Sequence, residues 1–339
     1  MHSKKNLLII IFVLLRGRIA SAASGGCASG DNVDNGGDFG GYISLQGEIE
    51  NTDNMGVDAV GELTYKTRRI YKTRAVFTVE GKYYRRTLVV EDFYLDHKFN
   101  KQLKLTAGIS KKILGLEYEH GRKDRATIHR GPIYQKMEDL GIVGRQFNLR
   151  LIGLPQKDDD DFKLSGAIGI DGSRDFNLQL SLQKSLGIFG VGVWVLAEAR
   201  KVGSYYAPLY AQTASLWIGQ GGARATLETF TGIDTQRTEF YSTFGEDRTV
   251  LFGGASFKLT HEYRVNNKFR LGPVFHASYW IDDLEKRDNN SLELLIGGRF
   301  SVRRIGVSLN GTVTGNAREG LEKRSFDDKE CYAEVIFYF

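Results

Sequence analysis

The chain contains little proline and almost no cysteine, with 4 Pro and 2 Cys among 339 residues. Two cysteines cannot form the disulfide framework of a small secreted fold, and lipidation of Cys27 and a Cys27–Cys331 disulfide both remain open. Scarce proline leaves long stretches in which every backbone N–H can join a β-ladder. Beyond the N-terminal region no stretch approaches 18 consecutive apolar residues, which excludes a helical membrane protein.

A strong excess of charge of one sign is also missing. The net charge of +5 includes four basic residues near the N-terminus, Lys4, Lys5, Arg16 and Arg18. Without them, 42 basic residues stand against 41 acidic ones. This near balance removes the argument for nucleic-acid binding that a pI near 9 would otherwise give.

The N-terminus has the three-part layout of a secretory signal peptide. Lys4 and Lys5 precede an apolar stretch at residues 7–15, and small residues follow at 20–23. The apolar stretch is too short for a transmembrane helix, so we expect export. The predicted organisation is a signal peptide at 1–23, a short flexible segment at 24–38 and a folded domain at 39–339.

Apolar and polar residues alternate with a period of two through most of that domain. In residues 176–183, Phe and Leu alternate with Asn, Gln and Ser (FNLQLSLQ), and residues 103–110 (LKLTAGIS) show the same pattern. Abundant glycine (40) and aromatics (12%) suit strands joined by tight turns. The pattern predicts about sixteen strands, near 39–50, 55–66, 70–83, 86–97, 101–112, 140–153, 161–171, 175–185, 188–201, 210–220, 222–232, 249–261, 267–281, 290–301, 303–314 and 329–339.

The gaps between these segments are sorted by length. With the N-terminus in the periplasm, the external gaps include the long ones, 113–139, 202–209, 233–248, 282–289 and 315–328, whereas the other end has mostly short turns. Such sorting is typical of outer-membrane barrels, and sixteen strands can enclose an aqueous channel. We therefore predict an all-β protein, a closed antiparallel transmembrane β-barrel. Phe339 on the last alternating strand resembles an outer-membrane assembly signal.

One region resembles a known family. Residues 91–100 (EDFYLDHKFN) and 103–108 (LKLTAG) precede 115–117 (GLE), 128–130 (IHR) and 139–142 (DLGI). This order resembles the phosphate-selective porin O and P family of bacterial outer-membrane porins over residues 86–153. The resemblance implies a sixteen-stranded trimeric barrel whose long third external loop, here 113–139, folds into the pore. The pore-lining lysines of phosphate-selective members have no residue-by-residue match here.

Two groups of basic residues are candidates for contact with a solute. In a narrow lumen, cations attract anions, and arginine offers a planar pair of donors to phosphate or carboxylate. The predicted constriction group in the third loop is Arg122, Lys123, Arg125 and Arg130. The predicted lumen-lining group, taken from the alternation, is Arg74, Lys104, Arg150, Arg224, Lys258, Arg270 and Arg299. Lys163 and Arg200 share the inward register with this group, so nine basic residues stand against seven acidic ones and the preference for anions should be weak. The acidic residues are Asp58, Glu62, Glu80, Glu198, Glu228, Glu293 and Glu334.

Aromatic residues near strand ends suggest a girdle at the membrane boundary. The girdle predicted on the outward face comprises Tyr42, Tyr65, Phe93, Phe257, Phe269, Tyr279, Phe300 and Phe337.

The predicted function is that of an outer-membrane porin for passive diffusion of small solutes and ions, with a weak preference for anions. The resemblance implies phosphate as one candidate solute. The alternative is a barrel whose external loops mediate surface binding or adhesion. No hydrolase, nucleotide-binding or metalloprotease motif occurs, so we expect no enzyme, cofactor or metal site. The expected partners are membrane lipid and lipopolysaccharide, small anionic or neutral solutes and two further copies in a homotrimer, without nucleic acid.

Overall fold

The computed structural model describes residues 38–50, 54–83, 86–119, 127–128, 132–153, 161–172, 175–202, 205–233, 238, 249–266, 269–284, 290–302, 304–317 and 325–339. The chain divides into two compact units, Met1–Gly36 and Gly37–Phe339, and every described element belongs to the second. The predicted signal peptide and Cys27 lie outside the described residues, whereas Cys331 is an exposed free thiol. No described helix is long and apolar enough to span a membrane.

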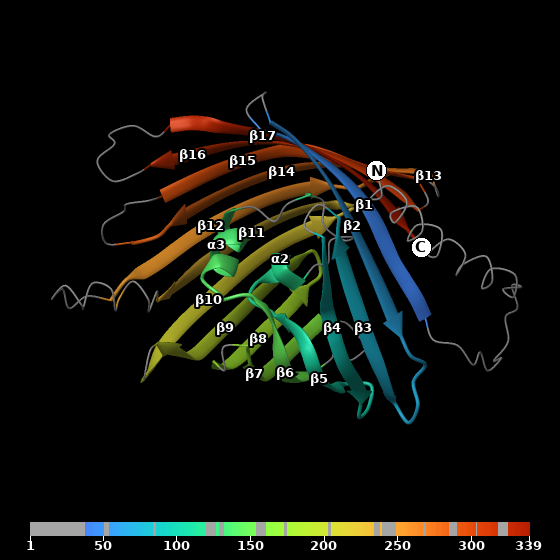
Figure 1. Ribbon diagram of the computed structural model, residues 1–339, viewed down its shortest axis with the longest axis vertical. Coiled ribbons are helices and arrows are strands. Elements are labelled where there is room, and N and C mark those ends of the chain that lie inside the picture. Colours follow the sequence, from blue (N-terminus) through green and yellow to red (C-terminus); the bar gives the residue numbers. More distant parts are fainter. Residues whose placement is uncertain are drawn as a thin grey trace, which may run out of the picture. The chain divides into compact units, whose positions relative to one another are not determined.

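The strands form one antiparallel sheet that closes on itself, because β1 pairs with both β2 and β17 (Figure 1). β12 and β13 both pair with β14 and together make one barrel strand, which gives the sixteen strands that the sequence predicted. The strands are β1 (Asp38–Glu50), β2 (Asn54–Lys66), β3 (Thr73–Lys82), β4 (Thr87–Lys98), β5 (Leu103–Lys112), β6 (Gly144–Gly153), β7 (Asp161–Ile170), β8 (Phe176–Leu186), β9 (Phe189–Val202), β10 (Tyr205–Gln220), β11 (Ala223–Ile233), β12 (Leu251–His261), β13 (Tyr263–Asn266), β14 (Phe269–Ile281), β15 (Asn290–Val302), β16 (Ile305–Ala317) and β17 (Ser325–Tyr338). Two short helices, α2 (Leu116–Glu119) and α3 (Pro132–Asp139), lie between β5 and β6.

The two faces of the barrel wall differ in polarity. On β8 the outward Leu178 and Leu180 are 45% and 50% exposed, whereas the inward Asn177 and Gln179 are 6% and 5% exposed. The same register continues around the sheet, so exposed Leu, Val, Ile and Phe cover the outside. A closed barrel pairs its backbone groups internally and can place such a surface in hydrocarbon. The barrel therefore spans a membrane.

Two details of the sequence-based prediction are wrong. Tyr42 is 2% exposed and shares the inward register with Ser44, because the outward residues of β1 have odd numbers, such as Leu45. The predicted external gap at 202–209 is mostly strand, since β10 begins at Tyr205 and pairs with β9 through Pro208.

The turn between β2 and β3 is unusually tight. Ile70 and Thr73 exchange backbone hydrogen bonds of 2.8 and 2.9 Å around the two-residue tip Tyr71–Lys72. Both tip residues have positive φ, 47° and 68°, which two-residue hairpins of this kind require and which asparagine or glycine usually supplies. An ordinary side chain in this left-handed region costs roughly 1–2 kcal/mol.

A tryptophan packs over a glycine inside the wall. Gly190 of β9 lies opposite Trp217 of β10, and a Cβ on Gly190 would come within 2.0 Å of the indole ring. Gly61 of β2 has open space around the corresponding position. Packing therefore requires glycine at position 190 but not at position 61, so the two positions can be compared directly.

We predict that Gly190→Ala lowers the free energy of unfolding by about 1–3 kcal/mol, the usual cost of overpacking, because Trp217 must move. The change is measured by unfolding the refolded barrel in urea, with heat-dependent gel mobility as the readout of the folded fraction. Gly61→Ala is the control and should change stability by less than about 0.5 kcal/mol. Equal stability of the two variants would contradict this packing argument.

Candidate pore constriction

One part of the inner wall is apolar. Inward side chains of β9, β10, β11, β12 and β14 form a continuous buried cluster, although a water-filled lumen would favour polar residues there. The wall residues of this cluster are Trp194, Leu196, Leu209, Ala211, Phe230, Phe252 and Trp280. Such a surface needs a covering segment.

The segment between β5 and β6 covers this surface. Its apolar side chains belong to the same cluster, and Figure 1 shows α2 and α3 inside the ring of strands. Each such side chain contributes about 1.5–3 kcal/mol when it leaves water. The side chains that the segment contributes are Leu114, Leu116, Tyr118, Ile133, Tyr134, Met137, Ile142 and Val143. We call residues 113–143 the constriction loop.

Glu228 of β11 anchors the constriction loop. Its side chain is buried, and its carboxylate accepts hydrogen bonds from the Leu116 backbone N–H (2.7 Å), the Tyr134 hydroxyl (2.8 Å) and the Ser215 hydroxyl (2.7 Å). One carboxylate therefore holds both helices of the loop against the wall. Hydrogen bonds to a charged acceptor are stronger than those between neutral groups.

The constriction loop also contacts walls on either side of Glu228. Glu119 lies 3.0 Å from the Lys163 ammonium of β7 and accepts a hydrogen bond of 2.7 Å from Gln183 of β8. The Ile128 backbone N–H donates to Asn310 Oδ1 of β16 at 2.8 Å. Since β7 and β16 are on separate parts of the ring, the loop reaches across the lumen.

A network of buried polar groups lies beside the start of the loop. Gln146 and Asn148 of β6 hydrogen-bond to one another and to Asn177 and Gln179 of β8. The Gln179 side chain in turn accepts the backbone N–H of Ile113 at 3.2 Å. These bonds satisfy polar groups that burial would otherwise penalise, and they fix the point at which β5 enters the loop.

Three carboxylates near the network, those of Asp171, Asp175 and Glu198, lie within 4.8 Å of one another. The Lys112 ammonium is 2.7 Å from Glu198, and Arg200 is 3.0 Å from the same carboxylate. Two cations already lie against these carboxylates, so we assign no metal to this group.

The four predicted constriction residues, Arg122, Lys123, Arg125 and Arg130, lie outside the described residues. Their role at the constriction stays a prediction, although the described parts of the loop on either side lie inside the barrel.

All seven residues of the predicted lumen-lining group stand on the inward register. Arg74 pairs with Asp96 at 3.0 Å, and Arg270 lies 3.3 Å from Glu262. Arg150 is 8% exposed and donates to the Lys111 carbonyl at 2.7 Å, so the wall itself holds it. Arg224 and Arg299 stack over the rings of Trp217 and Tyr338, respectively. Lys104 and Lys258 are half-buried.

Most of these seven cations also lie toward the short-turn end of the barrel, which the alternation alone does not reveal. Arg74, Lys104, Arg224 and Arg270 are each the second residue of a strand that leaves the short-turn end. Arg150 and Arg299 lie near the ends of strands that return to it, and Lys258 lies midway along the strand that β12 and β13 form together. In contrast, Glu48, Glu293 and Glu330 lie in the loop-end halves of their strands. The predicted strand boundaries could have revealed this polarity along the barrel axis.

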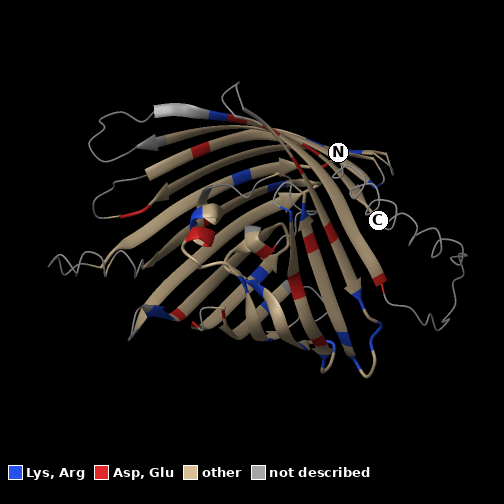
Figure 2. Ribbon diagram, viewed as in Figure 1, with Lys and Arg blue, Asp and Glu red and all other residues tan. Residues whose placement is uncertain are grey.

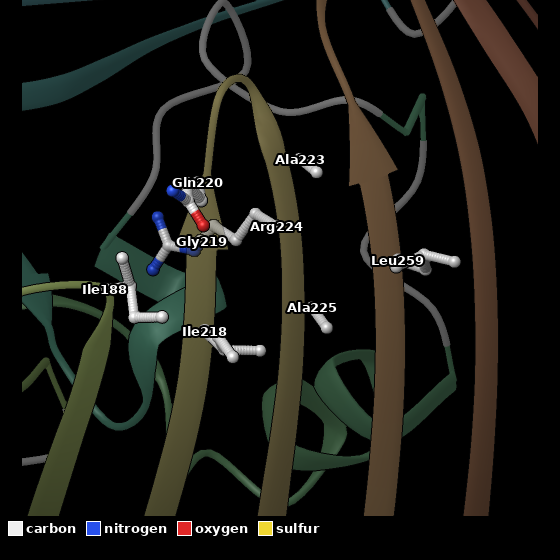
Figure 3. A pocket seen from close by; sticks show the side chains of 8 residues that line it. All are labelled: Ile188, Ile218, Gly219, Gln220, Ala223, Arg224, Ala225 and Leu259. Carbon is white, nitrogen blue, oxygen red and sulfur yellow. The ribbon is translucent and has the colours of Figure 1, made fainter.

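The structure contains a pocket of about 370 Å³ at the short-turn end of β9 to β12 (Figure 3). Ile218, Ala223, Ala225 and Leu259 in its lining stand on the outward register. The pocket therefore belongs mainly to the apolar outer surface and is not part of the constriction.

Solved structures with this fold are bacterial outer-membrane proteins. A loop-deletion mutant of OmpT from Vibrio cholerae superposes with a TM-score of 0.64 at 12% identity, over 90% of this chain and 100% of that one. The outer membrane channel DcaP of Acinetobacter baumannii gives 0.59 at 9% identity, over 92% and 100%. An anion-selective porin from Comamonas acidovorans gives 0.58 at 9% identity, over 89% and 99%.

No protein-family model and no curated protein sequence matches the chain. Its class is nevertheless defined by fold: the chain is a sixteen-stranded β-barrel of the bacterial outer-membrane type with the architecture of the porins. The particular resemblance to the phosphate-selective porins is not confirmed.

We predict that Glu228→Ala loosens the constriction loop, because Leu116 N–H and Tyr134 O–H lose a buried acceptor. An unsatisfied buried donor costs about 1–3 kcal/mol, so amide hydrogen exchange in residues 113–119 should accelerate by roughly ten-fold or more. Mass spectrometry of the exchanging barrel measures this rate. Glu262→Ala, at the short-turn rim, is the control. Unchanged exchange in Glu228→Ala would show that apolar packing alone holds the loop.

Proposed function

We propose that the chain is a porin of the bacterial outer membrane, which forms a water-filled channel for passive diffusion of small solutes and ions. The observation that best supports this proposal is that the inner wall has an apolar part and a charged part. The constriction loop covers the apolar part of the inner wall, while charged side chains on the remaining wall stay accessible to solvent. Among the inward residues of β2, β3 and β15, Glu62, Glu80 and Glu293 are all only partly buried. Water therefore reaches these side chains from inside the barrel.

We propose a homotrimer and a weak preference for anions, with phosphate as one candidate solute. The inward cations near the short-turn end support an anion preference, since guanidinium and ammonium groups in a confined lumen favour anions. The acidic residues toward the loop end oppose it, which is why the preference is weak. The proposed transport needs no catalytic group.

The selectivity test is Arg125→Glu combined with Arg130→Glu. Reversing two charges in a narrow passage, at about 1 kcal/mol each, should shift the anion-to-cation permeability ratio toward cations by roughly thirty-fold. The reversal potential of single channels in a planar bilayer across a salt gradient measures this ratio. Arg86→Glu with Arg304→Glu, at two exposed turn positions outside the constriction loop, is the matched control.

Unchanged selectivity in the first double variant would show that Arg125 and Arg130 do not lie at the constriction. No conductance steps from demonstrably folded wild-type barrels would overturn the porin proposal. That result would favour the alternative, a barrel whose external loops bind a surface.

The charge polarity along the axis gives a second prediction. With cations such as Arg74 and Lys104 near one mouth and acids such as Glu48 and Glu330 near the other, current should depend on the direction of the voltage at 0.1 M salt. At 1 M salt the Debye length shrinks from about 10 Å to about 3 Å, so this asymmetry should largely disappear. Current–voltage curves of barrels inserted in one orientation measure the effect, and equal currents in both directions at low salt would contradict it.

A further inference from the structure

Two neighbouring turns at the short-turn end concentrate positive charge. The first joins β2 to β3 and the second joins β4 to β5, and Figure 2 shows basic residues along the first. We call these two turns the basic hairpin pair. Its cations are Lys66, Arg68, Arg69, Lys72, Lys98 and Lys101, of which Arg68, Lys72, Lys98 and Lys101 are exposed.

Among the described residues of these two turns and of the strand ends that flank them, the acidic residues are Asp96 and Asp38. Asp96 is 2% exposed and is already paired with Arg69 and Arg74 at 3.1 and 3.0 Å. Asp38 of β1 lies opposite Lys66. Four cations of the pair, Arg68, Lys72, Lys98 and Lys101, lie at the surface.

Hydrogen bonds lock the two turns together. The Lys98 backbone N–H donates to the Lys72 carbonyl at 3.0 Å, and the Lys72 ammonium donates to the Phe99 carbonyl at 3.0 Å. Arg69 donates to the same Lys72 carbonyl at 3.0 Å. The pair is therefore a preformed surface, and its cations need little ordering before they bind.

Apolar groups project from the same surface. Ile70 is 67% exposed and Tyr71 is 93% exposed, at a tip whose backbone adopts a conformation unfavourable for both Tyr71 and Lys72. Phe99, on the second turn, is 44% exposed. Strained residues that persist in a fold are often held for function. A tip with aromatic and aliphatic side chains among cations suits a surface that is part hydrocarbon and part anionic headgroup.

The lipid-facing surface continues directly into this pair. On the outer face next to the turns, Phe39 and Tyr65 stack with ring centroids 4.5 Å apart, and His97 packs against Phe99 at 4.8 Å. Aromatic residues at strand ends mark the boundary between membrane and water. The cations of the hairpin pair therefore stand at the level of the headgroups.

We propose that the basic hairpin pair binds the headgroups of anionic phospholipids in the leaflet at the short-turn end of the barrel. The lysines and arginines would contact the phosphates, while Tyr71 and Ile70 enter the interfacial region. A second copy that contacts this surface through its own hairpin pair is a poorer occupant, because it would bring the same positive charge to the contact. This inference depends on the membrane-spanning fold and not on the proposed channel.

The test uses the full-length folded barrel in a neutral detergent. Native mass spectrometry compares retention of phosphatidylglycerol and phosphatidylcholine with identical acyl chains. We expect wild type to retain phosphatidylglycerol at least about ten-fold more strongly, and Arg68→Ser with Lys72→Gly and Lys101→Ser to weaken that retention by roughly a hundred-fold. Glycine at position 72 suits the positive φ, so the backbone of the turn and the two hydrogen bonds to the carbonyl of residue 72 are preserved, while the bond from the Lys72 ammonium to Phe99 is lost.

Arg264→Ser with Arg304→Ser is the matched control, since both residues lie at the same end of other strands and are exposed. It should keep the wild-type preference. Equal retention of both lipids by wild type, or an equal loss in the control, would overturn the proposal. A triple variant that alters the oligomeric mass while leaving lipid retention unchanged would identify a second copy as the occupant and would also overturn it.

Tyr71→Asn tests the contribution of the aromatic ring to lipid retention independently of the charges. Asparagine tolerates the left-handed backbone, so the turn should persist without the ring. Because the ring interacts with the interface irrespective of headgroup charge, we expect retention of both lipids to fall several-fold while their ratio is preserved. Unchanged retention would restrict the binding surface to the cations.

Discussion

The pairing of backbone hydrogen-bonding groups is the constraint on which the rest of this structure depends. In hydrocarbon an unpaired N–H or C=O has no water to replace its partner, so a sheet in a membrane must close. Here β1 supplies that closure by pairing with β2 on one side and β17 on the other. Closure then divides every strand into one outward and one inward face, and a shift of one residue would exchange them.

The inner face serves two purposes on two parts of the wall. Between β9 and β14 it is apolar and binds the constriction loop, much as one layer of a soluble core binds another. Elsewhere it carries the charges that contact solvent. Glu228 is a polar anchor within the apolar part. Its buried carboxylate holds the backbone of α2 and the tyrosine of α3. The loop position is thus determined by both hydrophobic packing and one polar anchor.

The two ends of the barrel differ as strongly as its two faces. Cations occupy the first inward positions at the short-turn end, and the basic hairpin pair extends that charge to the rim. Glu48, Glu293 and Glu330 lie toward the loop end. One consequence is an electric field along the lumen. Another is a rim whose charge complements an anionic leaflet, so the same sequence feature bears on the passage of solutes and on the contact with lipid.

The sequence by itself determined the strands, the closed barrel and the inward side of the seven lumen cations, because a period of two is a local property of the chain. The predicted outward position of Tyr42 is wrong, because the pairing of β1 places its side chain on the inward face. The break in pairing between Thr78 and Val79 also escapes the pattern, as a bulge depends on the neighbouring strand. Only the tertiary structure decided that Glu228 anchors the constriction loop and that Arg69, Lys72 and Phe99 join two turns. These contacts link residues far apart in the chain, and their geometry exists only once the sheet has closed.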